Sequence, residues 1–244
     1  MAVLVSGALS SGLVIIGDEI LSGKRVDKHL AQVIRILSAR GLSLAWAEYV
    51  GDDPVRITAV LTRALASGDV VFSCGGIGAT PDDHTRQCAA RALDVPLALH
   101  PQARIWIIER MHDMAREQGV PLDESSPENQ RRLEMGMFPQ GAGVIANPYN
   151  KIPGFACAST HAQPRHPNAG VYFVPGFPVM AWPMIESVLD QRFVDAFARD
   201  AYREQSVIVL GAMESTLAPL MQRIEADHAG IKVFSLPSVD HPQW

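Results

Sequence analysis

The apolar residues of this 244-residue chain alternate between short continuous runs, typical of buried strands, and stripes at helical spacing. Continuous runs predict strands at residues 12–17 and 69–74, and the alternation of apolar and polar residues predicts another at 42–50. After the first strand, a stripe at positions i, i+3, i+4 and i+7 predicts a helical face made of Leu30, Val33, Ile34 and Leu37. Gly41 ends that helix, and the next helix has Asp53 as its N-cap and Pro54 at its first position.

Strands and helices continue to alternate downstream. Helices are predicted at residues 85–93, 100–118 and 179–200, the last with a kink or break at Pro183. A strand beginning near residue 170 runs into a Pro-Gly turn, and residues 119–170 predict only short strands. This order indicates the α/β class, as a three-layer α/β/α domain with a mostly parallel sheet.

A second pattern begins near residue 203, with a strand, a helix and a strand at residues 206–211, 214–230 and 231–238. We therefore divide the chain into an N-terminal extension (1–11), a main domain (12–198) and a small C-terminal α/β unit (203–244). The small unit cannot bury both of its faces alone. It is expected to pack on the main domain, on another subunit, or on sequence missing from a truncated C-terminus.

Composition narrows the function classes. A net charge of −5 gives no basic surface for nucleic acid. The apolar N-terminal run lacks a positive n-region and is too short to span a membrane. Three cysteines without CxxC spacing indicate reduced thiols and a cytoplasmic protein. Cys74 is read as a small core residue, His84 as a solvated one, and His161 and His166 as loop residues.

The stretch "CGGIGATPDDHT", residues 74–85, carries the candidate chemistry. It follows a predicted strand and precedes a predicted helix, so its backbone N–H groups and the helix dipole favour an anion. It is neither a Walker loop nor GxGxxG. A structural interpretation stays open, in which Thr80 is the N-cap, Pro81 the first helical residue and Asp83 a capping-box acid. That interpretation leaves the three glycines and the paired aspartates unexplained.

The aspartates suggest a cation. A carboxylate beside a bound phosphate would repel it, and a divalent cation between them reverses the sign of the interaction. Mg²⁺ is typically held by one or two carboxylates together with substrate phosphates. The loop therefore predicts a phosphate-bearing ligand bound with Mg²⁺ or another divalent cation.

Three segments, "GDEILSG" (17–23), "VGDD" (50–53) and "GGIGATPDDHT" (75–85), resemble the molybdopterin-binding (MoCF-type) domain of molybdenum-cofactor biosynthesis proteins. The stretches "ENQRRLEMGMFPQGAGVIANPYNKIPGF" and "VYFVPGFPVMAWPM" resemble the branch found at the N-terminus of CinA-type proteins. The resemblance covers about residues 12–190. "ESTLAPLM" also looks like the start of the CinA-type middle domain, whereas the deamidase domain of full-length CinA is absent from this sequence.

The resemblance implies site residues one by one. The family's "GGTG" appears here as Gly75, Gly76, Ile77 and Gly78, so a threonine hydroxyl is lost. The catalytic acids fall on Asp83, which is also the expected metal ligand, and on Asp52. Ligand-binding positions expected near the pterin or phosphate are Gly17, Asp18, Glu19, Ser22, Gly23 and Thr80. Gly176, in the "PGFP" turn, either lines the same cleft or serves a structural turn.

The implied ligand is molybdopterin or another small pterin, or a nucleotide. Biosynthetic relatives imply Mg²⁺-assisted adenylyl transfer onto molybdopterin, and the CinA-type branch implies metal-dependent hydrolysis of a nucleotide pyrophosphate such as ADP-ribose. A non-catalytic pterin- or nucleotide-binding module is the third alternative. Because relatives form oligomers, we expect a homo-oligomer, as a dimer or trimer.

Overall fold

The computed structural model describes residues 9–197, 205–229 and 231–236. These residues fall in two compact units, Met1–Tyr202 and Arg203–Trp244. Most of the predicted N-terminal extension lies outside the described residues, and the first strand begins at Ser10.

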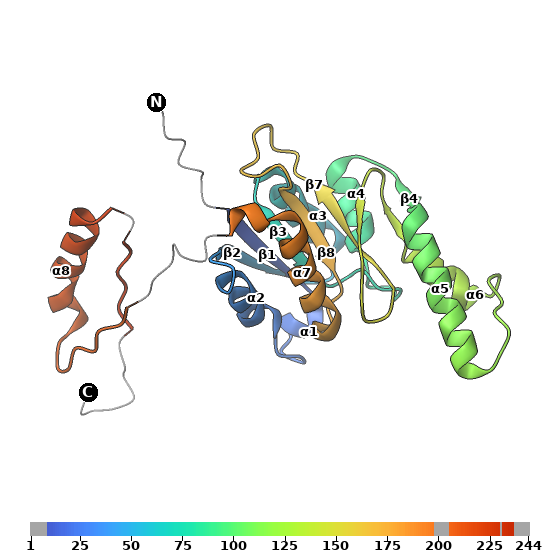
Figure 1. The fold of residues 1–244 in the computed structure, drawn as a ribbon, viewed down its shortest axis with the longest axis horizontal. Coiled ribbons are helices and arrows are strands. Elements are labelled where there is room, and N and C mark those ends of the chain that lie inside the picture. Colours follow the sequence, from blue (N-terminus) through green and yellow to red (C-terminus); the bar gives the residue numbers. More distant parts are fainter. Residues whose placement is uncertain (1–8, 198–204, 230, 237–244) are drawn as a thin grey trace. The chain divides into compact units, whose positions relative to one another are not determined.

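The first unit is built on a six-stranded sheet with the order β2-β1-β3-β8-β7-β6 (Figure 1). Its four parallel strands are β2 (Ser43–Val50), β1 (Ser10–Ile16), β3 (Val70–Cys74) and β8 (Gly170–Val174). Two antiparallel strands complete it, β7 (Gly154–Ala158) and β6 (Gly143–Ile145). The mostly parallel sheet predicted from the sequence is thus confirmed.

Helices cover both faces of this sheet. On one face lie α2 (His29–Ser38) and α7 (Pro178–Arg192), and on the other lie α3 (Pro54–Ala66) and α4 (Thr85–Leu93). The helix α5 (Pro101–Gln118) adds residues to the same core as α3 and α4 but extends beyond the sheet (Figure 1). Each face of the sheet has its own apolar core, and alternate residues of β1 point into one or the other. Leu13 packs in the core with α2 and α7, whereas Val14 packs in the core with α3. Strands buried on both faces read as continuous apolar runs, which explains the pattern in the sequence and confirms the three layers.

Two helical predictions need correction. Ile34 was expected on the buried face of α2, but it is 43% exposed and Ile36 is buried instead. Of the kink or break predicted at Pro183, the break does not occur: α7 runs from Pro178 to Arg192 and is followed by a short 3-10 turn, η1 (Val194–Ala196). Ala181 and Met184, on either side of the proline, are fully buried, and their packing offsets the lost intrahelical hydrogen bond.

The region 119–170 contains more structure than its composition predicted. Besides short strands it forms α6 (Pro127–Glu134), whose N-cap Ser126 accepts a hydrogen bond from the backbone of Asn129. A separate antiparallel pair joins β4 (Leu97–Leu99) to β5 (Met137–Pro139). None of the helices in the described residues combines the length and apolar character needed to span a bilayer.

The second unit forms its predicted helix, α8 (Glu214–Asp227). The two predicted strands are wrong for the residues described, since 205–209 and 231–236 have no regular structure. Residues 237 and 238 of the second predicted strand lie outside the described residues. A strand exists only when another strand pairs with it, so β-prone sequence alone does not make one.

Candidate functional site

The ends of β1 and β3 bring the first glycines of the predicted site together. At Gly75 a Cβ would lie 2.3 Å from the carbonyl oxygen of Ile16, and the residue has a φ of +110°. Only glycine fits so close an approach in that conformation. The turn after β8 joins the same place, because a Cβ on Gly176 would lie 3.4 Å from the Cα of Gly75. Glycines 17, 75 and 176 therefore gather at the carboxyl edge of the sheet, where open α/β sheets bind ligands.

A short helix, α1 (Asp18–Leu21), follows directly after Gly17, and its first residue exchanges hydrogen bonds with Asp52, two residues after β2. The backbone N–H of Asp18 donates to Asp52 Oδ2 at 2.8 Å, and the N–H of Asp52 donates to Asp18 Oδ1 at 3.2 Å. Gly51 leaves room for this exchange, since a Cβ there would lie 2.3 Å from Asp18 Oδ1. Two carboxylates predicted from separate sequence motifs are thus fixed side by side.

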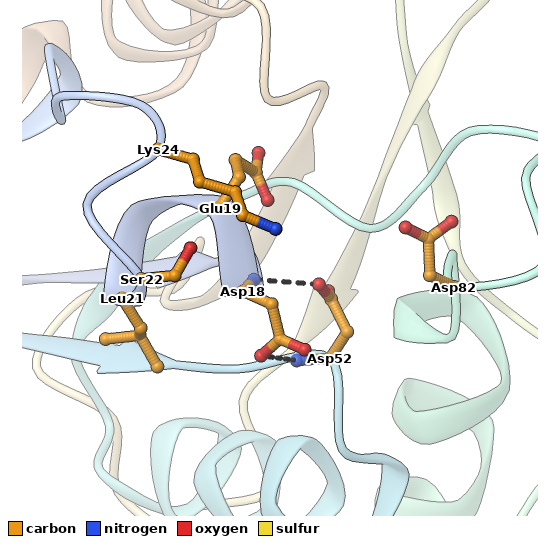
Figure 2. A pocket seen from close by; sticks show the side chains of 7 residues that line it. All are labelled: Asp18, Glu19, Leu21, Ser22, Lys24, Asp52 and Asp82. Atoms are coloured by element: carbon orange, nitrogen blue, oxygen red, sulfur yellow. Dashed lines mark hydrogen bonds between the residues drawn. The ribbon is translucent and has the colours of Figure 1, made fainter.

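These residues line a cleft of about 560 Å³, within the range of small-molecule sites (Figure 2). Four predicted residues line it: Asp18, Glu19, Ser22 and Asp52. Three lining residues were not predicted: Leu21, Lys24 and Asp82. Figure 2 shows Asp82 across the cleft from Asp18 and Asp52.

The cleft concentrates negative charge. Burial raises the pKa of Asp52, and the neighbouring carboxylates of Asp18, Glu19 and Asp82 raise it further, against a lowering contribution from the Asp18 N–H. Among the described residues, none of these four acids takes part in an ion pair. A cation would therefore be stabilised here, and an anion alone would be repelled.

The carboxylates do not converge on one point. The part of the chain that the structure describes contains no group of three or more His, Cys, Asp or Glu side chains arranged to hold a metal ion. The donor set nevertheless fits Mg²⁺, which prefers oxygen ligands and keeps several positions for water or substrate phosphate. Such a site needs the ligand to complete it.

The glycine loop places its two aspartates differently. Asp83 turns toward the loop, where its Oδ1 accepts from the N–H of Gly78 at 2.9 Å. Its Oδ2 accepts from both the N–H and the hydroxyl of Thr80, at 2.8 and 2.5 Å. Asp82 is the aspartate that lines the cleft, whereas the sequence analysis assigned the site acid to Asp83.

The predicted helix cap is also different. Thr80 is not an N-cap and Asp83 is not in the first turn, because α4 begins at Thr85 with His84 as its N-cap residue. Thr85 instead ties the helix to the loop through hydrogen bonds with the carbonyl oxygens of Gly76 and Gly75. Residues 80–83 form a turn, closed by hydrogen bonds between Thr80 and Asp83.

Three loop amides stay available for an anion. Within the described residues, the N–H groups of Gly76, Ile77 and Ala79 have no hydrogen-bond partner, whereas those of Gly78 and Thr80 are taken by Asp83. Two of them, Gly76 and Ile77, are consecutive, and consecutive backbone N–H groups can form an anion-binding concavity. The predicted phosphate site therefore narrows to these three amides, whose residues lie near the cleft-lining Asp82 in sequence but do not line the cleft themselves.

Two buried polar residues near the loops were missed from the sequence. His29 is 4% exposed and its Nε2 lies 3.0 Å from the carbonyl oxygen of Gly176, which joins α2 to the turn after β8. Arg86 is 5% exposed and donates from Nη1 to the carbonyl oxygen of Ile77. Their spacing from buried residues could have revealed them, since His29 is four before Val33 and Arg86 is three before Ala89.

The other candidates have structural roles. Cys74 is fully buried and burial raises the pKa of its thiol, so it is a core residue as predicted. His166 lies in a loop but is buried, with Nε2 at 3.2 Å from both carboxylate oxygens of Asp195. His161 lies in the same loop and is exposed.

Known proteins resemble this chain over most of its length. Residues 12–195 match the family described as a probable molybdopterin binding domain. A CinA-like protein from Desulfosudis oleivorans is 30% identical over 222 residues, which are 88% of this chain and 49% of that protein. Protein TV0584 from Thermoplasma volcanium is 28% identical over 225 residues, which are 92% of this chain and 79% of that protein.

Among solved structures, the protein CinA of unknown function from Thermoplasma acidophilum matches with a TM-score of 0.61. The match covers 77% of this chain and 99% of that one at 24% identity, so it supports the fold alone.

Proposed function

The chain belongs to the family of probable molybdopterin-binding domains, and on this premise we propose that its cleft binds the phosphates of a pterin or nucleotide together with a divalent cation. One observation carries the proposal: Asp52, partly buried beside three other carboxylates, lies in a cleft into which the glycine loop also projects Asp82. Carboxylates without cationic partners and free amides are complementary to a cation and to phosphate oxygens, respectively.

The chain's own residues divide the work. Asp52 and the neighbouring acids hold the cation, and the backbone N–H groups of Gly76, Ile77 and Ala79 donate hydrogen bonds to phosphate oxygens. Lys24, which lines the cleft, offers a cationic side chain to the same phosphates. When bound, the cation supplies charge neutralisation for the phosphate groups.

The chemistry that fits this arrangement is cleavage of a phosphoanhydride. With molybdopterin and ATP it would be adenylyl transfer: a phosphate oxygen of molybdopterin adds to the α-phosphorus and pyrophosphate leaves. With ADP-ribose it would be hydrolysis: water adds to one phosphorus, the bridging P–O bond breaks, and AMP and ribose 5-phosphate result. CinA-like relatives support testing the second reaction first.

The test is incubation of the purified chain with ADP-ribose and, in parallel, with ATP and molybdopterin, each with Mg²⁺, Mn²⁺ or Co²⁺. Release of AMP or formation of adenylylated molybdopterin is expected, and EDTA should abolish it. Failure of all combinations alongside an active control enzyme would reject the catalytic proposal.

A non-catalytic module is the second candidate, and it is favoured by the lack of convergence among the carboxylates in the described residues. It predicts cation-dependent binding of the same ligands, measured by titration calorimetry, with no product after prolonged incubation.

Self-association is part of the proposal. In the second unit, Val207, Ile208 and Leu236 are each more than four-fifths exposed, which is unfavourable for apolar side chains in water. We expect a dimer or trimer, and light scattering coupled to size-exclusion chromatography would detect a monomer if the expectation is wrong.

A further inference from the structure

One peptide group of the glycine loop is held at both ends by charged side chains. The N–H of Gly78 donates to Asp83 Oδ1 at 2.9 Å, and the carbonyl oxygen of Ile77, in the same peptide group, accepts from Arg86 Nη1. The carboxylate lies at the positive end of the peptide dipole and the guanidinium at its negative end. Both hydrogen bonds are charge-assisted, the stronger kind in proteins. The orientation of the Ile77–Gly78 peptide is therefore strongly determined.

Arg86 is an unusual residue to bury under a loop. Burial lowers the pKa of its guanidinium, and the carboxylates of Asp83 and Glu134 oppose that change. Across the described part of the chain, no direct ion pair involves Arg86, and its guanidinium donates to the loop carbonyl instead. Burying a charge is costly. Since the buried Arg86 guanidinium donates its hydrogen bond to a loop carbonyl, we infer that its role is to hold the loop in shape.

The same hydrogen bonds leave Asp83 little capacity to bind a ligand. Its two oxygens already accept three hydrogen bonds, from Gly78 and twice from Thr80. Gly78 also fits closely against it, because a Cβ there would lie 2.6 Å from Asp83 Oδ2. Asp82, by contrast, is exposed and lines the cleft opposite Asp52 (Figure 2).

We propose that Asp83 and Arg86 are positioning residues that fix the Ile77–Gly78 peptide, and that Asp82 is the loop carboxylate facing the ligand-bound cation. The clamp leaves the amides of Gly76, Ile77 and Ala79 free for the ligand's phosphate. The assignment of Asp82 rests on the proposed function, whereas the clamp rests on the loop geometry alone.

The experiment compares Asp82→Asn, Asp83→Asn and Arg86→Gln, with Arg91→Gln as a control because Arg91 is exposed on the same helix. ADP-ribose affinity is measured by calorimetry with and without Mn²⁺, and the ratio of the two Kd values gives the coupling between cation and ligand. For wild type we expect a coupling in the usual range of about 5- to 150-fold. Asp82→Asn should reduce it to about one.

Asp83→Asn and Arg86→Gln should behave differently. Both should weaken ADP-ribose binding by about tenfold, with and without Mn²⁺ alike, so that the coupling ratio is kept. A merely structural defect would not separate the variants in this way. Arg86→Lys, which keeps the charge, should recover part of the affinity lost in Arg86→Gln.

Amide hydrogen exchange tests the clamp without any ligand. The Gly78 and Thr80 amides should exchange at least about tenfold faster in Asp83→Asn, and the Gly78 amide should do so in Arg86→Gln. The exchange rates of both amides should be unchanged in Asp82→Asn.

Unchanged exchange rates in Asp83→Asn and Arg86→Gln would overturn the clamp. Loss of coupling in Asp83→Asn with retention of coupling in Asp82→Asn would overturn the assignment of the cation-facing acid. If wild type bound neither Mn²⁺ nor ADP-ribose, the proposed function and the role of Asp82 would fall, and the exchange rates would still decide the clamp.

Discussion

Carboxylates at the two edges of the central sheet differ in whether they have partners of opposite charge. At the amino edge, Asp69 precedes β3 and is 7% exposed; its Oδ2 accepts from Trp46 Nε1 at 2.9 Å, and Arg165 lies 3.6 Å from Oδ1. His166 and Asp195 pair with each other near the same edge. At the carboxyl edge, Asp18, Glu19, Asp52 and Asp82 share a cleft, and the described residues supply them with no ion-pair partner.

The difference separates structure from function. A buried polar group that has found its partners contributes to stability and has little left to offer a ligand. A group of like charges kept together costs stability, and such costs concentrate at functional sites. On this argument, residues of the amino edge should affect folding, and residues of the carboxyl edge should affect binding.

The largest expected effect comes from Asp52→Asn. It should lower the rate of AMP release from ADP-ribose, or the cation-dependent affinity if the chain does not turn over, by about 100-fold or more. The melting temperature should stay the same or rise, because the variant removes a charge that its neighbours oppose while keeping an oxygen for the Asp18 N–H. Asp53→Asn is the matched control, since Asn caps a helix as well as Asp does. A large fall in melting temperature for Asp52→Asn would break the comparison.

The converse change is Asp69→Ala at the amino edge. It leaves the Nε1–H of the half-buried Trp46 without its acceptor, which should cost about 1–3 kcal/mol of unfolding free energy. In a domain of this size that corresponds to a fall in melting temperature of roughly 2–12 °C. Ligand affinity, measured well below the melting temperature, should be unchanged, and a parallel loss of affinity would show that the two edges are not independent.

A smaller effect is expected from the cation itself. Mn²⁺ added to EDTA-treated protein at ten times its Kd should stabilise the fold by about 1.4 kcal/mol, or roughly 3–5 °C. The shift should vanish in Asp52→Asn and persist in Asp69→Ala. Equal shifts in both variants would place the cation elsewhere.

The smallest effect sharpens the comparison within the carboxyl-edge region. Asp27 accepts from the N–H groups of His29 and Leu30 and from the Tyr49 hydroxyl at 2.9 Å, so it is a paired acid. Burial, and then the hydrogen bond to Asp27, raise the pKa of Tyr49 from 10.0 to about 12. Because the folded state favours the neutral phenol, the raised pKa stabilises the fold fully below pH 10. This contribution to the free energy of unfolding is lost as the pH rises from 10.0 to about 12. Tyr49→Phe should cost about 0.5 kcal/mol and leave binding intact. It should also remove the most alkaline tyrosinate transition from an absorbance titration; if that transition stayed, the assignment would be wrong.

Parts of the candidate site were readable from the sequence for local reasons. Gly17, Asp18, Asp52 and Gly75 sit at predicted strand ends, and parallel strands deliver their carboxyl ends to one edge. The cap at Asp53 also follows from neighbouring residues alone. The choice between Asp82 and Asp83 does not, because it depends on which carboxylate meets the amides of Gly78 and Thr80 once the loop has closed.

The same limit explains the errors in the fold. A helical stripe indicates a buried face, but the centre of that face depends on how α2 lies against the sheet, which favours Ile36 over Ile34. The apolar segment from 206 to 211 has strand-forming residues, yet pairing needs a partner that local sequence does not specify.

By itself, the sequence determined the α/β class, the alternation of strands and helices, and the set of loops that carry glycines and acids, because periodicity and turn chemistry act over a few residues. Only the tertiary structure decided which of those acids lack an ion-pair partner among the described residues, which one has both oxygens hydrogen-bonded within the loop, and that Arg86 lies buried beside the loop. Hydrogen-bond satisfaction and burial are properties of groups brought together across the chain, and no local pattern contains them.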